Sequence, residues 1–163
     1  MTKGKESASN LNRKWSRTLI KAGWTAIPSI VLEKQDALGL DAVDVNILMH
    51  RIRHWWYRDN LPYPAKKTIA KCMGVNVSTI RRHVARMQAA NFIARIKRTD
   101  PATGRQESNH YDLQGLIGSV LPFAREAVQQ RQRHRAEAAE RLRRKRPKAS
   151  PIDVAATGGA AHD

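Results

Sequence analysis

The residues best placed to do chemistry in this chain are cations, and they gather in one stretch. Between Asn60 and Thr99 the sequence holds nine lysines and arginines and no acidic residue. Lys and Arg neutralise phosphates, and Arg also pairs with base edges. The absence of acids favours a nucleic-acid surface over an ordinary solvated face. The formal charge of the 163 residues, +16, predicts attraction to polyanions but no sequence preference.

Apolar residues recur at helical spacing on both sides of Gly74. Gly74 can take the left-handed conformation that ends a helix, and Asn76 can cap the next helix. A helix, a short turn with glycine and a second helix form the layout of a helix-turn-helix, which we place at residues 65–90. The positions expected to face the core are Ile69, Ala70 and Met73 in the first helix and Ile80, Val84 and Met87 in the second.

Three short runs carry a resemblance to a known family. They are Ile69-Ala70 with Met73-Gly74-Val75-Asn76, then Thr79-Ile80-Arg81-Arg82, then Asn91-Phe92-Ile93. They resemble the Ile-Ala-x-x-Leu-Gly-Val-Ser, Thr-Val-x-Arg and Gly-Leu-Ile runs of the bacterial winged helix-turn-helix DNA-binding family. Asn76 replaces the family's Ser and can still cap a helix, while Asn91 replaces Gly and tolerates the left-handed conformation. The resemblance implies the DNA-binding domain of a transcription regulator, or of a plasmid, phage or replication-initiation protein.

The rest of the chain fits a mainly α fold with a small β-hairpin wing. From Asp41 to Tyr57 apolar residues follow spacings of three and four, and Asp41 is a good N-cap. We expect this helix to pack across both motif helices. Two strand patterns around a polar loop predict the wing at residues 92–113. A winged helix-turn-helix domain is therefore expected at residues 14–122, after a mobile basic arm at residues 1–13.

The C-terminal part has a different composition. Pro122 predicts a helix break or start, and residues 123–147 predict a basic C-terminal helix. From Arg131 to Lys148 nine basic residues accompany two acidic ones. Apolar positions there are too sparse for a coiled coil, so we expect this helix to contact the DNA backbone or a protein partner. Residues 148–163 predict a disordered tail.

The second motif helix, residues 77–90, is the expected recognition helix. Opposite its buried line it carries Ser78 and Arg82, and an α-helix fits the major groove. Our hypothesis is that Arg82 reads a guanine edge; the alternative is that the arginines of this helix contact phosphate only. The full set of expected DNA-binding residues is Lys66, Lys67, Thr68, Asn76, Ser78, Thr79, Arg81, Arg82, Arg86, Lys97, Arg98 and Arg105.

Several kinds of site are not expected. We find no nucleophile–base pair, glycine-rich phosphate loop or paired carboxylates, so we predict neither catalysis nor a cofactor. His50 and His54 share a helix face, but no further ligand stands near them in sequence, so we predict no metal. The polar first twenty residues indicate no secretory signal, and no apolar run could cross a bilayer. We therefore expect a cytoplasmic, nucleoid-associated protein.

The expected partner is double-stranded DNA, bound sequence-specifically for transcription regulation. A replication or partition accessory protein of a plasmid or phage is the first alternative. RNA binding is another, supported by charge alone, since the aromatic residues that would stack on bases look buried. A protein-interaction module using the basic helix is the last. A homodimer on paired half-sites is expected, with a monomer as the alternative.

Overall fold

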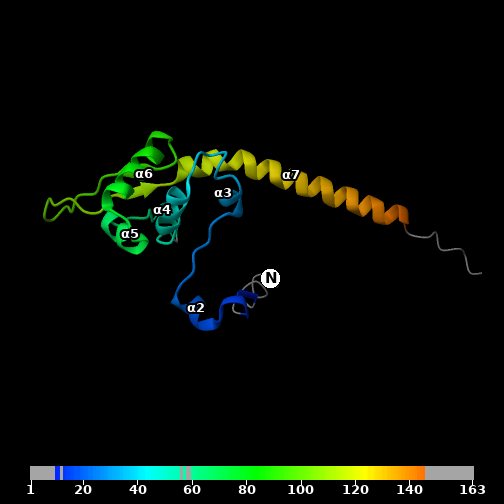
Figure 1. Cartoon of the computed structure of the whole chain (residues 1–163), viewed down its shortest axis with the longest axis horizontal. Helices are drawn as coiled ribbons and strands as arrows, with labels where there is room; N and C mark the ends of the chain where they lie inside the picture. Colours follow the sequence, from blue (N-terminus) through cyan, green and yellow to red (C-terminus); the bar gives the residue numbers. More distant parts are fainter. Residues whose placement is uncertain (1–9, 12, 56, 58–59, 146–163) are drawn as a thin grey trace, which may run out of the picture. The chain divides into compact units, whose positions relative to one another are not determined.

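The computed structural model describes residues 10–145 except 12, 56, 58 and 59. The chain divides into two compact units, residues 1–125 and 126–163. The elements of the described residues, drawn in Figure 1, are α2 (Arg17–Ala22), α3 (Ser29–Glu33), α4 (Ala42–Ile52), α5 (Lys66–Met73), α6 (Val77–Ala89), β1 (Ala94–Ile96), β2 (His110–Asp112) and α7 (Gln114–Lys145). The fold is mainly helical with a small antiparallel hairpin, which confirms the predicted winged helix-turn-helix class.

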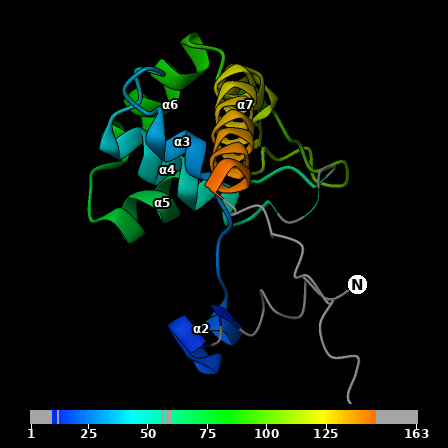
Figure 2. The same cartoon turned by 90° about the vertical axis from the view of Figure 1, so that its right-hand side faces the viewer.

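The helix-turn-helix consists of α5 and α6. Gly74 ends α5 in the left-handed conformation, with φ of 65°. Asn76 caps α6, because its side-chain oxygen accepts a hydrogen bond from the backbone N–H of Ser78 at 2.9 Å. The helices α5 and α6 pack on each other, and α4 packs on α6 (Figure 2). The local signals in the sequence therefore predicted this motif correctly.

The core forms where α4, α5 and α6 meet the wing and the start of α7. The predicted line Ile80, Val84 and Met87 is at most 1% exposed. Burial of such side chains stabilises the fold by about 1.5–3 kcal/mol each. The other buried apolar residues are Val31, Leu40, Val45, Ile47, Leu48, Ile69, Ala70, Phe92, Ile93, Tyr111, Leu113, Leu116 and Val120.

The helix α4 is capped as predicted but shorter than predicted. Asp41 Oδ1 accepts the N–H of Asp44 at 2.9 Å, and Asp44 Oδ2 accepts the N–H of Asp41 at 3.1 Å. The helix ends at Ile52 instead of Tyr57, because the chain tightens there and the N–H of Trp55 donates to the carbonyl of Ile52. This turn lets Trp55 pack against the core. The tertiary contact therefore overrides the helical spacing.

The wing is anchored to the segment that leads into α5. In the antiparallel pair of β1 and β2, Arg95 lies opposite Tyr111. The N–H of Tyr111 also donates to the carbonyl of Pro62 at 3.0 Å. Asn91, just before β1, has the left-handed φ of 58° that its place in the sequence predicted. These bonds hold the returning strand of the wing beside the helix-turn-helix.

The helix α7 begins at Gln114, so the prediction that Pro122 breaks or starts a helix is wrong. Asp112 Oδ1 accepts the N–H of Gln114 at 2.8 Å, which satisfies the start of the helix before the proline is reached. Pro122 cannot donate to the carbonyl of Gly118. Because Gly118 is exposed, water can take that bond and the helix continues.

The start of α7 approaches the turn after α6 very closely. A Cβ on Gly115 would lie 1.7 Å from the carbonyl oxygen of Asn91. The N–H of Leu116 donates to the carbonyl of Phe92 at 2.9 Å. A side chain at position 115 would therefore separate α7 from this turn.

Parts of the expected termini cannot be compared. Of the predicted arm only Asn10, Leu11 and Arg13 are described, and the predicted tail at residues 148–163 lies outside the described residues. Within the described part of the chain, no helix is both long and apolar enough to cross a membrane.

Candidate nucleic-acid interface

One face of α6 is free of the core and carries predicted contact residues. Ser78, Arg81 and Arg82 are exposed, and Thr79 is half-buried. The Ser78 hydroxyl donates to Asn76 Oδ1 at 3.0 Å, and this oxygen also accepts the backbone N–H of Ser78. The side-chain oxygen of Asn76 is therefore used to cap α6. The rigid helix therefore presents two arginines and a short polar side chain to solvent.

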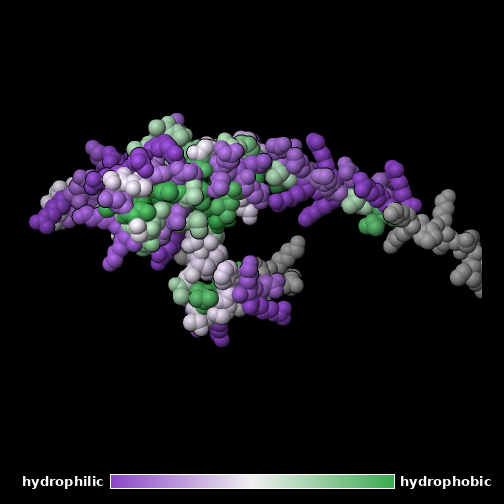
Figure 3. Space-filling model, in the orientation of Figure 1, coloured by the Kyte–Doolittle hydropathy of each residue, from purple (hydrophilic) through white to green (hydrophobic). Residues whose placement is uncertain are grey.

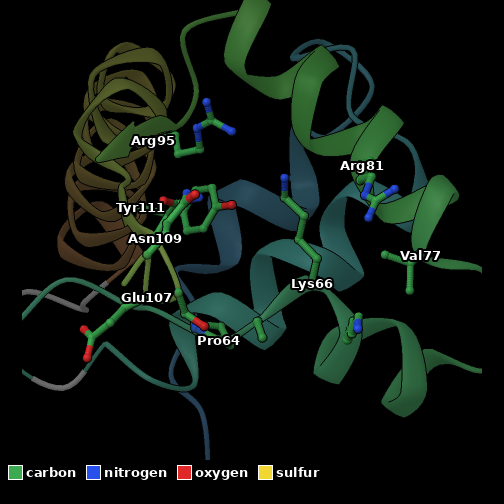
Figure 4. Close-up of a pocket in the computed structure, with 12 residues that line it drawn as sticks. Pro64, Lys66, Val77, Arg81, Arg95, Glu107, Asn109 and Tyr111 are labelled. Atoms are coloured by element: carbon green, nitrogen blue, oxygen red, sulfur yellow. The ribbon is translucent and has the colours of Figure 1, made fainter. Parts of the chain in front are cut away.

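A basic cleft of about 320 Å³ lies between α5, α6 and the wing. Lys66 and Lys67 line it from α5, and Arg81 lines it from α6. Arg95, on β1, also lines it, although the sequence analysis did not include this residue. Figure 4 shows Lys66, Arg81 and Arg95 around one opening, with Tyr111 on the side of the wing. Only the strand register, which places Arg95 opposite Tyr111, brings Arg95 to this cleft.

The base of the wing holds one predicted contact residue in place. Arg98 Nη2 pairs with Glu107 Oε2 at 2.6 Å, and the Arg98 guanidinium lies 5.5 Å from the ring centroid of Tyr63. The Tyr63 ring in turn stacks on His110 at 5.7 Å. Lys97 and Arg105 are exposed, as is Thr68 in the first turn of α5. Arg98 is therefore anchored to the wing while Lys97 and Arg105 are open to solvent.

Arg86 is placed differently from its neighbours on α6. Its Nη2 atom bonds Asp41 Oδ2 at 2.6 Å and also bonds Asp44 Oδ2. Burial is the largest single influence on Asp41 and raises its pKa, but the hydrogen bond and the charge of Arg86, together with smaller contributions, hold the pKa of this carboxyl below its usual value. Arg86 was predicted to contact DNA. In the structure its guanidinium bonds the carboxylates of Asp41 and Asp44 at the start of α4. The side chain of Asp44, the second carboxylate that Arg86 bonds, is fully buried.

His83 completes this ion-pair cluster of Asp41, Asp44, His83 and Arg86. His83 is buried, and its Nδ1 lies 2.8 Å from Asp44 Oδ1. Two carboxylates and an imidazole with ligand atoms within 4.8 Å of one another could hold a metal ion. The Arg86 guanidinium already bonds both carboxylates, so the cluster works as a connection between α4 and α6.

Arg51 is the largest side chain in the core that carries a charge. It is 0% exposed, and its three guanidinium nitrogens have no hydrogen-bond partner among the described residues. The guanidinium carbon lies 3.4 Å from the ring centroid of Tyr111. Burial lowers the pKa of Arg51, and Tyr111 opposes this shift. The sequence analysis missed Arg51, although its spacing from Leu48 places it on the buried face of α4.

The aromatic residues are more exposed than the sequence indicated. Trp15, Trp24, Tyr57 and Tyr63 are 52%, 47%, 75% and 49% exposed. The expectation that aromatics are buried is wrong for these four, because the segments that carry them lie outside the helical core. This observation weakens the argument against RNA binding, since exposed rings can stack on bases.

The described part of the second unit, residues 126–145, is helical. The side chains of residues 126–144 are exposed except that of Ala127, which is half-buried, and an ion pair joins Glu140 and Arg144 at 3.2 Å. Figure 3 shows a mostly hydrophilic surface along the basic segment of α7. The role of this segment on DNA or on a protein partner stays a prediction.

The sequence matches no protein family model and no curated protein. Among solved structures, the N-terminal domain of DnaD protein from Geobacillus kaustophilus HTA426 is 20% identical, with a TM-score of 0.49, covering 81% of this chain and 99% of that one. A crystal structure of MarR is 23% identical, with a TM-score of 0.37, covering 72% of this chain and 86% of that one. Structural similarity with TM-scores of 0.49 and 0.37 does not indicate a function for this chain.

Proposed function

We propose that this protein binds double-stranded DNA sequence-specifically, with α6 in the major groove. The observation that carries the proposal is the division of α6 into two faces. On one face Ile80, Val84 and Met87 are buried in the core and fix the helix there. On the opposite face Arg82 is exposed to solvent. Arginine is the side chain that most often reads guanine in the major groove.

The surrounding cations support the same orientation on DNA. Lys66 and Lys67, at the start of α5, are placed to contact the phosphate backbone of one DNA strand. Lys97 and Arg105 extend this basic surface along the wing. Phosphate contacts of this kind set the register of a protein on the duplex. We propose non-enzymatic transcription regulation in the cytoplasm, on the nucleoid, as the role and a homodimer on DNA as the binding form. A monomer on DNA is the alternative.

The test is selection of bound duplexes from a random library by the full chain, followed by a salt titration on the selected duplex. An enriched palindrome with half-sites about one helical turn apart supports a dimeric regulator. Enrichment of a single site, repeated in arrays, supports the replication or partition role instead. No enrichment together with steep salt dependence contradicts sequence-specific binding, because charge then supplies the affinity.

RNA binding is the second candidate function, and the exposed aromatic rings are the observation that favours it. A parallel selection from single-stranded RNA distinguishes it. If RNA of a defined sequence is bound more tightly than the best duplex at the same salt concentration, the DNA proposal is wrong. Trp24→Ala is the first variant for that case, because its ring is 47% exposed.

A further inference from the structure

The basic cleft between α5, α6 and the wing is lined by four cations and one carboxylate, so its net charge is positive. Among the described residues, none of its four cations, Lys66, Lys67, Arg81 and Arg95, has an ion-pair partner. Glu107 also lines the cleft, but it is paired with Arg98. The cleft is therefore an electropositive concavity of the kind that concentrates anions.

The backbone adds to this charge. Ala65, the N-cap of α5, lines the cleft, and no side chain caps that helix. Val77, the first residue of α6, lines it as well. Helix N-termini carry partial positive charge, and the start of α5 also has N–H groups that no side chain caps, so an anion is favoured here.

A third source of positive charge lies behind the wall of the cleft. Arg51 does not line the cleft, but its guanidinium stacks on the ring of Tyr111, which does. A fully buried cation that has no hydrogen-bond acceptor within bonding geometry among the described residues is unfavourable, because the Tyr111 ring compensates only part of its desolvation. An anion in the cleft would be separated from Arg51 by one aromatic ring and would offset part of that cost.

We propose that the cleft binds a phosphate group of the DNA backbone and that the buried charge of Arg51 strengthens this binding through the ring of Tyr111. The inference rests on the proposed DNA binding and specifies where one strand passes. A phosphodiester fits a site built from α5, α6 and β1, since the strand then runs between the recognition helix and the wing. Arg95 is the direct contact, and Arg51 acts without touching the ligand.

The experiment measures the dissociation constant of the full chain for its selected duplex as a function of KCl. Arg95→Gln removes a contact and Arg51→Met removes the buried charge at similar length. Lys21→Gln is the control, since Lys21 is an exposed cation on α2 outside the cleft. We expect Arg95→Gln to weaken binding at least about threefold more than the control and to lower the salt slope by about 0.9, the value of one phosphate.

Arg51→Met separates the proposal from a purely structural role. We expect weaker DNA binding with a midpoint of urea unfolding that is unchanged or raised, because the variant loses a buried charge that Tyr111 compensates only in part. Binding equal to that of the wild type would overturn the assignment of Arg51. A large fall in the urea midpoint would overturn it too, because the guanidinium would then be paired within the fold.

The source of the phosphate is tested separately. Inorganic phosphate is titrated at constant ionic strength while the side-chain amide signals of Gln106 and Asn109, which line the cleft, are followed by NMR. Weak shifts that Arg95→Gln abolishes, together with the loss of DNA affinity, support the proposal. Phosphate binding with unaltered DNA affinity in Arg95→Gln contradicts it. If the wild type binds no duplex at all, the proposed function itself has failed, and that result is distinct from wild-type DNA binding that Arg95→Gln leaves intact.

Discussion

His83 on α6 and Asp44 on α4 lie 2.8 Å apart, from Nδ1 to Oδ1, inside the helix-turn-helix domain. Both side chains are buried, and Arg86 closes the cluster from the solvent side. The helix α6 is thus connected to α4 by charge as well as by apolar packing. An ion-pair cluster of this kind restricts the rotation of α6 about its axis, which sets the side that Arg82 faces.

Asp44→Ala should destabilise the fold by about 1–3 kcal/mol, since it removes the carboxylate 2.8 Å from the buried His83 and leaves only Asp41, at 3.6 Å, near that ring. Arg86 is 49% exposed and can turn to water, so it adds less. Urea unfolding followed by circular dichroism measures the change. Asp36→Ala, at an exposed position, is the control and should stay within about 0.5 kcal/mol. Equal effects of the two substitutions would contradict a structural role for the cluster.

Arg86→Gln should leave the salt dependence of DNA binding unchanged, because its guanidinium is bonded to Asp41 and Asp44. The free energy of unfolding should fall by about 1 kcal/mol or less, the usual range for a partly exposed pair. The salt slope of the selected duplex and a urea titration measure the two effects. A slope lower by about 0.9 would show that Arg86 contacts phosphate after all.

Arg82→Ala should relax the preference at one base pair by about 1–3 kcal/mol, if this exposed residue reads a guanine edge. Competition binding with duplexes substituted at single positions measures it. Arg86→Gln is the matched control on the same helix and should keep the wild-type preference. A uniform loss of affinity on every duplex, with a shallower salt slope, would assign Arg82 to phosphate instead.

The free energy of unfolding should decrease as the pH is lowered into the acidic range, because the Asp41 carboxylate becomes protonated there. The pKa of Asp41 is lower in the fold than its ordinary value of 3.8. Its carboxylate therefore contributes stability above pH 3.8, and that contribution is lost as the pH falls below 3.8 and through the folded value. Asp41→Asn keeps an N-cap and should flatten this part of the profile. Unfolding titrations from pH 6 downward test it, and identical profiles for both proteins would rule it out.

Gly115→Ala and Gly118→Ala should have opposite effects, although both lie in α7. A Cβ at position 115 meets the Asn91 carbonyl oxygen, so overpacking should cost about 1–3 kcal/mol or more. A Cβ at position 118 meets nothing within 4 Å, and the better helix propensity of Ala should stabilise by up to about 1 kcal/mol. Thermal unfolding compares them. Destabilisation by both would mean that Pro122 makes the whole start of α7 sensitive.

The sequence by itself determined the parts that depend on neighbouring residues. Gly74 and Asn76 specify the turn between α5 and α6, and the spacing of Ile80 and Val84 orients α6, because caps and periodicity act within a few residues. The left-handed conformation of Asn91 could also be predicted, because it depends on the residue type and its immediate neighbours. Hydrophobic spacing also identified the exposed side of α6.

Only the tertiary structure decided which charges are free. Arg82 and Arg86 look equivalent in the sequence, but Arg86 meets Asp44, a residue 42 positions away. The strand register places Arg95 at the basic cleft, and helix packing places Arg51 behind Tyr111. Periodicity gives the face on which a side chain lies, whereas its partner depends on how distant elements pack. The electrostatics of the interface therefore arise from long-range contacts that a local pattern does not contain.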